Sequence, residues 1–240
     1  MRSPMKDNEQ LMTKSDIYLE MRRRICLLDY QPGTRLNERE LAAEFGISRT
    51  PMRDVLQKLE HNGLISSQHG HGTIVTSIDL KSMRDIYLVR MRLMDAMGDS
   101  TPAPRNPDIL DEMRGLEARC DSMLHDHDKR EFARVLLRLH KILHGLTTNA
   151  VLKDINDTLF YQSARFWFLL LDRVDMRVQV EDLRDEIRML RRSLEIGDVK
   201  LTVSIHKTYL RVVVSRLDAI QEEGGTLFES GPSKTEKETT

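Results

Sequence analysis

A run of helix and turn signals in the first third of the chain constrains the fold more than any other feature. Asn37 begins a segment that resembles a capping box, and the short apolar helix that follows ends at Gly46. After a short turn, Ser48 or Thr50 can cap another helix, which Gly63 stops. Two helices joined by a tight turn that contains glycine predict a helix-turn-helix.

The segments on either side complete a small domain. A helix that Ser15 or Asp16 can cap comes first, with apolar residues along one face. After the last helix, residues 64–67 and 73–76 have the pattern of two strands around Gly70-His71-Gly72, which predicts a β-hairpin. A hairpin in this place makes the domain a winged helix-turn-helix, and the glycines let its tip approach a nucleic-acid backbone closely.

The second helix of the pair carries the chemistry of a DNA reader. With Val55 and Leu59 facing inward, Arg49, Arg53 and Gln57 fall at i, i+4 and i+8 on the opposite face. The donor fork of arginine matches a guanine edge or a phosphate, and helix-turn-helix proteins read bases from the N-terminal part of this helix. An ordinary solvated helix face is the alternative. The coincidence of cap, turn, periodicity and wing favours DNA binding.

The rest of the chain predicts a mainly α protein. Residues 78–221 are almost wholly helical by pattern, with one break from Gly98 to Pro107, where three prolines forbid a continuous helix. We therefore predict a winged helix-turn-helix domain over residues 13–77 and an all-helical bundle over residues 78–221. Residues 222–240 have the composition of a disordered tail.

Composition sets limits on the class of protein. Hydrophobic residues make up 40% and charged residues 31% of the chain, which indicates a soluble globular protein. No apolar run approaches the ~20 residues of a membrane span, and no signal peptide is visible, so we expect a cytoplasmic protein without a membrane partner. Cys26 and Cys120 match no zinc spacing. No nucleophile–base motif or phosphate loop indicates an enzyme.

The first domain resembles the GntR family of transcriptional regulators. The segments that carry the resemblance are Arg39-Glu40-Leu41-Ala42, Ser48-Arg49-Thr50-Pro51-Met52-Arg53, Gly63-Leu64-Ile65 and Gly72-Thr73. Gln68-His69-Gly70 is similar to the wing of the FadR subfamily. The resemblance implies a homodimer on a short palindrome of double-stranded DNA. It also implies DNA contacts from Arg39, Ser48, Arg49, Thr50, Arg53, His69 and Gly70.

The second domain resembles the ligand-sensing FCD domain of that subfamily. Many FCD domains hold a metal with one Asp and three His. At the corresponding positions this chain has Leu136, His140, Ile187 and Tyr209, and a register shift of three would bring in His206. A single imidazole without its partner ligands does not hold a divalent ion tightly. We therefore expect no metal and no cofactor.

The resemblance also suggests an effector pocket without a metal bridge. Its expected lining is Arg90, Leu136, His140, Trp167, Ile187 and Tyr209. Such a pocket suits an acidic effector with an apolar part, with Arg90 on the acidic group. Alternatively, Arg90 forms a salt bridge to Asp95 or Glu186.

Two further features have a simple structural interpretation. The i, i+4 pair of His140 and His144 has no third ligand nearby and is interpreted as helix surface. The aromatic cluster from Phe160 to Phe168 is interpreted as packing core, although the resemblance allows it to line the cavity.

The function that these features predict is a metabolite-responsive repressor. The main alternative is a constitutive regulator that has lost its effector and its metal site. A purely structural DNA-packaging protein is disfavoured because DNA binding alone does not need the large helical region.

Overall fold

The computed structural model describes most of the chain. The described residues are 12–68, 72–77, 79–104, 106–171 and 174–222, and at 68 and 166–169 only the backbone is described. No helix in these ranges is both long enough and apolar enough to cross a membrane.

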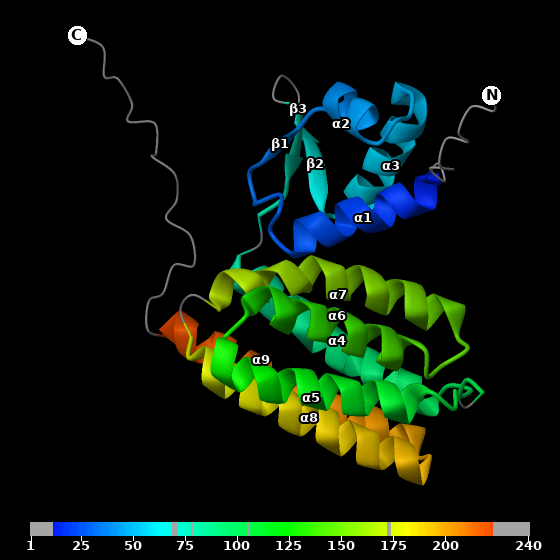
Figure 1. The fold of residues 1–240 in the computed structure, drawn as a ribbon, viewed down its shortest axis with the longest axis vertical. Coiled ribbons are helices and arrows are strands. Elements are labelled where there is room, and N and C mark those ends of the chain that lie inside the picture. The colour runs from blue at the N-terminus through cyan, green and yellow to red at the C-terminus, as the bar shows by residue number, and fades with distance from the viewer. Residues whose placement is uncertain (1–11, 69–71, 78, 105, 172–173, 223–240) are drawn as a thin grey trace, which may run out of the picture.

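The N-terminal domain packs three helices against a small sheet (Figure 1). In chain order its elements are α1 (Lys14–Cys26), β1 (Arg35–Leu36), α2 (Glu38–Glu44), α3 (Arg49–His61), β2 (Ile65–Gln68) and β3 (Gly72–Val75). The strands are antiparallel in the order β1-β3-β2. The predicted helix-turn-helix and hairpin are therefore present, and the two-residue strand β1 adds an edge that the sequence pattern is too short to reveal.

The caps explain where the helices begin. Asn37 caps α2 by accepting hydrogen bonds from two backbone N–H groups. The cap of α1 is Thr13, and Asp16 completes its capping box, so the predicted caps Ser15 and Asp16 were placed too far along the chain. Ser48 is the N-cap of α3 by position, but its side chain makes no capping hydrogen bond. Its hydroxyl is exposed on the surface beside the start of α3.

The domain closes a core of its own, which fixes the orientation of α3. Buried apolar side chains from α1, α2, α3 and the sheet form one cluster. Its members on α3 are Met52, Val55, Leu56 and Leu59. Because these four residues occupy one helical stripe, the other side of α3 faces solvent.

The C-terminal domain is a bundle of six described helices (Figure 1). They are α4 (Leu80–Asp99), α5 (Ile109–Asp126), α6 (Lys129–His144), α7 (Ala150–Leu170), α8 (Met176–Ile196) and α9 (Val199–Glu222). α4 packs along α9, and α5 packs along α8. This agrees with the predicted mainly α fold, and α9 runs one residue into the predicted tail.

The break in the bundle begins later than expected. α4 continues through Gly98 and ends at Asp99, before the proline-containing segment. A Cβ at Gly98 would lie 2.9 Å from Cγ2 of Val203 on α9. Gly98 is therefore a site of close helix packing, and only the prolines interrupt the helix.

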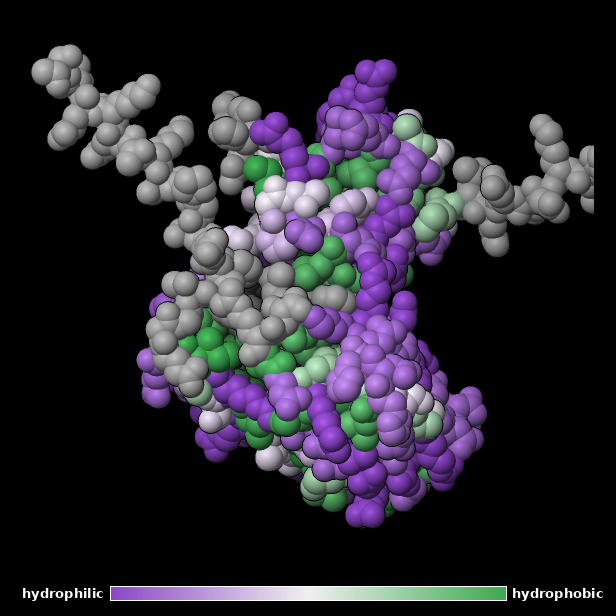
Figure 2. Space-filling model, turned by 60° about the vertical axis from the view of Figure 1, so that its left-hand side comes forward, coloured by the Kyte–Doolittle hydropathy of each residue, from purple (hydrophilic) through white to green (hydrophobic). Residues whose placement is uncertain are grey.

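The two domains meet through α1 and α7. α1 lies across α7, which forms the side of the bundle nearest the N-terminal domain (Figure 1). The space-filling view shows the same two lobes, with a mostly hydrophilic surface interrupted by apolar patches (Figure 2). α2 and the first turns of α3 lie on the far side of α1 from the bundle, so they remain open to a large partner (Figure 1).

Candidate DNA-reading surface and sensor cavity

The outer face of α3 presents the predicted basic side chains. Arg49 and Arg53 are 66% and 60% exposed at their side chains. Arg39 on α2 and Thr50 on α3 are also exposed. The predicted wing contacts His69 and Gly70 lie outside the described residues. The remaining predicted contacts thus share one surface formed by α2 and the first turns of α3.

A carboxylate that sequence reasoning missed holds the two arginines together. Nε of Arg49 lies 3.0 Å from Oε1 of Glu38, and Nε of Arg53 lies 3.1 Å from Oε2. The hydrogen bond from Arg53, followed by that from Arg49, lowers the pKa of Glu38. Exposed ion pairs of this kind contribute little to stability, so the arginines can exchange Glu38 for a nucleic acid at low cost.

Replacing this carboxylate is expected to weaken discrimination between DNA sequences. Glu38→Gln frees two guanidinium groups and removes one negative charge, so affinity for random DNA rises. We expect the ratio of operator to random-DNA affinity to fall about two- to fivefold. Asp54→Asn is the control, because Asp54 lies on α3 beside Arg53 and pairs with Lys14 instead. Fluorescence anisotropy with both DNAs measures the ratio. An unchanged ratio in Glu38→Gln would contradict a role in specificity.

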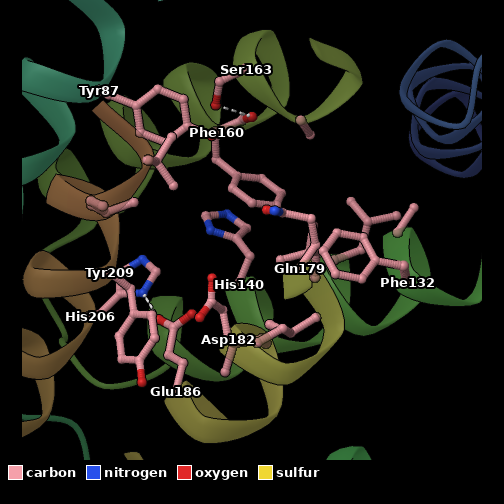
Figure 3. A pocket seen from close by; sticks show the side chains of 18 of the residues that line it. Tyr87, Phe132, His140, Phe160, Ser163, Gln179, Asp182, Glu186, His206 and Tyr209 are labelled. Carbon is pink, nitrogen blue, oxygen red and sulfur yellow. Dashed lines mark hydrogen bonds and ion pairs between the residues drawn. The ribbon is translucent and has the colours of Figure 1, made fainter. Parts of the chain in front are cut away.

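The bundle helices line a partly open cavity, to which Cys26 and Leu27 at the end of α1 also contribute. Its volume is about 110 Å³, which is enough for several waters or a small organic molecule. Figure 3 shows His140 between Phe160 on one side of the cavity and Asp182 and Glu186 on the other. The predicted residues Arg90, Leu136, His140 and Tyr209 all line it.

Two predicted lining residues have a different outcome. Ile187 is fully buried in the core between α5, α6 and α8, and its neighbour Glu186 lines the cavity instead. The predicted position was therefore off by one residue, which is a rotation of about 100° on a helix. Trp167 belongs to α7, and its side chain lies outside the described residues.

Arg90 is a buried cation in the wall of this cavity. It is 3% exposed, and its Nη1 donates a hydrogen bond of 3.3 Å to Oγ of Ser163. Its Nε has no hydrogen-bond partner among the described residues. Burial lowers the pKa of Arg90, and nearby Tyr87 and Glu186 oppose that shift. A buried guanidinium with a free donor is well suited to hold an anion.

The alternative salt bridges for Arg90 are wrong. Asp95 pairs with Lys207 at 2.6 Å. Glu186 lies 2.5 Å from Nδ1 of His206, and Figure 3 shows this pair within the cavity wall. Arg90 remains close enough to Glu186 for an electrostatic interaction without forming an ion pair.

His140 is buried in the wall of the cavity, so its interpretation as helix surface is wrong. Its Nε2 lies 3.0 Å from Oδ1 of Asp157, and its ring stacks on Phe160 with 3.6 Å between centroids (Figure 3). Burial lowers the pKa of His140 to about 4. The neutral ring must donate from Nε2, because an ionised carboxylate only accepts.

Two further charged side chains in the wall, Arg216 and Asp182, are paired with each other. Arg216 donates to Gln179 at 2.7 Å and also pairs with Asp182. Among the described residues, no three His, Cys, Asp or Glu side chains form a potential metal site. From the sequence, Glu186 is only a possible partner of Arg90 and Asp182 is not identified, although the four-residue spacing of these two carboxylates on a predicted helix places them on one face.

Comparisons with known proteins agree with this arrangement. The family model for bacterial regulatory proteins, gntR family, matches residues 13–75, and the FCD domain model matches residues 85–193. An HTH-type transcriptional regulator in an unstable DNA locus of Streptomyces ambofaciens is 30% identical over 222 residues, covering 90% of this chain and 89% of the relative.

A further relative is similar in sequence over part of the chain, and a solved structure is similar in fold. The fatty acid metabolism regulator protein of Pasteurella multocida is 42% identical over 76 residues, which cover 31% of this chain and 30% of that protein. The solved structure of E. coli McbR/YncC has a TM-score of 0.70 at 17% identity, and covers 88% of this chain and 100% of that chain.

Proposed function

The chain belongs to the gntR family of bacterial regulatory proteins and carries an FCD domain, and we propose from this premise that it represses transcription as a homodimer on a short palindromic operator. It is a DNA-binding transcriptional regulator of the FadR type and not an enzyme. A regulator whose ligand is double-stranded chromosomal DNA acts in the cytoplasm.

One observation carries the proposal of sequence-specific reading. Arg49 and Arg53 stand one turn apart at the start of α3, exposed and joined by Glu38. A helix that presents two arginine forks from its N-terminal half matches the geometry of major-groove readout. Arg39, Ser48 and Thr50 are exposed near the pair, which supports the proposal that they also contact the DNA.

The proposed effector is a small acid with an apolar part. The free Nε of Arg90 supplies an anchor for the acid group. Leu136, Phe160 and Leu183 supply apolar walls, whose burial against the effector contributes ~25 cal/mol per Å². An effector that binds one arrangement of the two domains better than the other shifts their population, and so changes DNA affinity.

A constitutive regulator is the second candidate. Leu136 and Tyr209 stand where related sensors are expected to have metal ligands, and both line the cavity. Apolar and aromatic side chains at these positions are what a cavity without an effector would also contain. A thermal-shift screen of small carboxylic acids against wild type and Arg90→Met separates the two, because only an effector gives a shift that the variant loses.

Operator selection tests the proposed function directly. We expect the full chain to enrich a palindromic sequence from random DNA, and to sediment as a dimer. Residues 1–77, which contain a complete core, are expected to sediment as a monomer and to bind one half-site weakly. Failure to enrich any sequence would remove sequence-specific regulation, and a monomeric full chain would remove the homodimer.

The sensor is expected to bind no divalent metal tightly. Leu136 and Tyr209 supply no imidazole or carboxylate, and among the described residues His140 and His206 belong to no group of three His, Cys, Asp or Glu side chains that could hold an ion. Elemental analysis after purification without chelators should find well under one metal per chain, and added zinc should not raise the melting temperature. One metal per chain that disappears in His140→Ala would contradict this expectation.

A further inference from the structure

α7 is shared by the cavity and the N-terminal domain. Phe160, Ser163 and Ala164 line the cavity. Gln162 and Arg165, which lie between and beside these residues in the chain, contact the N-terminal domain. A movement of α7 in response to a change in the cavity therefore changes its contacts with the N-terminal domain, and the reverse also holds.

The contacts of Gln162 and Arg165 hold the end of α3. Nε2 of Gln162 donates to the carbonyl of Asn62 at 3.0 Å, just after the last residue of α3. Arg165 is 1% exposed, and it donates to Oγ1 of Thr76 at 2.7 Å and to the carbonyl of Leu64 at 3.4 Å. These bonds fix the point where α3 passes into the wing.

A second route runs from the cavity to α1. His140 in the cavity wall donates to Asp157, and the other oxygen of Asp157 lies 2.6 Å from Nη1 of Arg22. Arg22 is 8% exposed, and its guanidinium lies 3.5 Å from the centroid of the Tyr161 ring. A buried cation that loses its carboxylate is strongly destabilised, so Arg22 must follow Asp157 when Asp157 moves.

We propose that α7 couples occupancy of the cavity to the placement of α3, with Asp157 and Arg165 as positioning residues. The proposal rests on the proposed function, because it assumes that the cavity has an occupant. An acid group on Arg90 competes with Ser163 for the guanidinium, and an apolar body displaces the stack of His140 on Phe160. Both changes displace side chains of α7. The contacts of Asp157, Gln162 and Arg165 transmit this displacement to α1 and to the end of α3.

In this proposal, the contact between α7 and the N-terminal domain has two arrangements. In one arrangement α7 holds the end of α3 and α1 as the structure shows. In the other, the N-terminal domain is released from α7, and the spacing of two such domains in a dimer is no longer fixed. An occupant that fits only one arrangement shifts the balance, and couplings of this kind are worth about 5- to 150-fold in affinity.

A cavity-filling substitution tests the coupling without knowledge of the effector. Leu136→Phe adds volume to the cavity from α6. Hydrogen exchange of the full chain then reports on the amides of Leu64 and Thr76, which donate to Leu59 and Leu64 respectively. We expect Leu136→Phe to accelerate exchange of these two amides about fivefold or more. Affinity for the selected operator should change by a similar factor.

Asp157→Asn separates coupling from general disturbance. On that background, Leu136→Phe should accelerate exchange at Leu64 and Thr76 less than it does in wild type, because the ion pair of Asp157 with Arg22 is lost while the contacts of Gln162 and Arg165 remain. Asp154→Asn is the matched control, since Asp154 is exposed on the same helix one turn earlier, and it should leave the response intact. Gln162→Ala removes only one neutral hydrogen bond and should also reduce the response. It replaces Asp157→Asn in the test if Asp157→Asn fails to fold.

Two outcomes would overturn the proposal. One is a full response to Leu136→Phe in Asp157→Asn and Gln162→Ala, and the other is exchange that changes only within the bundle. Exchange needs no DNA, so its result stands even if operator selection fails. A selected operator together with an unresponsive Leu64 and Thr76 would leave the proposed function intact and remove the coupling alone.

Discussion

The double variant Arg49→Ala/Arg53→Ala is expected to lose operator recognition while its fold stays intact. Each arginine that contacts a base edge contributes about 5- to 150-fold to affinity for the cognate site, and the two lie close enough to act together. Both side chains are well exposed and outside the core of the domain, so the melting temperature should change little. The expected residual binding is the affinity for random DNA.

Salt dependence and a charge-matched control identify what is lost. Lys81→Ala/Arg177→Ala removes the same charge from exposed positions on α4 and α8. This control should bind the operator within about twofold of wild type. Loss of arginines that read bases lowers affinity for the operator selectively. Loss of arginines that contact only phosphates lowers affinity for all DNA and reduces the salt slope by about one for each arginine. Operator binding like that of wild type would show that α3 is not the reader.

Acid is expected to destabilise the protein through His140 well before its carboxylates are protonated. Burial lowers the folded pKa of His140 from 6.5 to about 4. The unfolded chain therefore binds more protons than the folded chain between these two values, and stability falls as pH falls through this window. Above pH 6.5 the contribution is fully present. Between pH 7.5 and 4.5 we expect a loss of about 2–3 kcal/mol from this residue.

Melting temperature against pH measures this loss. His140→Gln keeps a donor for Asp157 and removes the titration, so its melting temperature should be flatter with pH even if the variant is less stable overall. For a chain of this size the difference in slope corresponds to about 5–10 °C across the window. His125→Gln, at an exposed position on α5, should keep the slope of wild type. Equal slopes for all three proteins would mean that folding does not lower the pKa of His140.

The N-terminal domain was predictable because its signals are local. Asn37, Gly46 and Gly63 mark helix ends by backbone chemistry that involves only neighbouring residues. The apolar stripe of α3 likewise follows from the helical repeat, and it correctly placed Arg49 and Arg53 on the outer face. Glu38 escaped notice because its importance depends on two residues of a different helix.

The sensor was less predictable because its site is assembled from distant segments. Counting along the chain placed Ile187 in the pocket, whereas the rotation of α8 brings Glu186 there. His140 looked like a surface residue because its partners Asp157 and Phe160 belong to the next helix. Sequence identified the right helices, and only three-dimensional packing decides which of their faces meet.

The contact between α1 and α7 has a consequence for how the protein is made. Arg22 and Asp157 are separated by 135 residues, whereas the core of the N-terminal domain is complete by Val75. At ~5–20 residues per second, synthesis leaves an interval of roughly 7–27 s between the two ends of that contact. During translation we expect the domain to fold first and to remain without a sensor. If synthesis stops in this interval, the released fragment would contain the N-terminal domain without the sensor. It would compete for operator half-sites and would not respond to an effector.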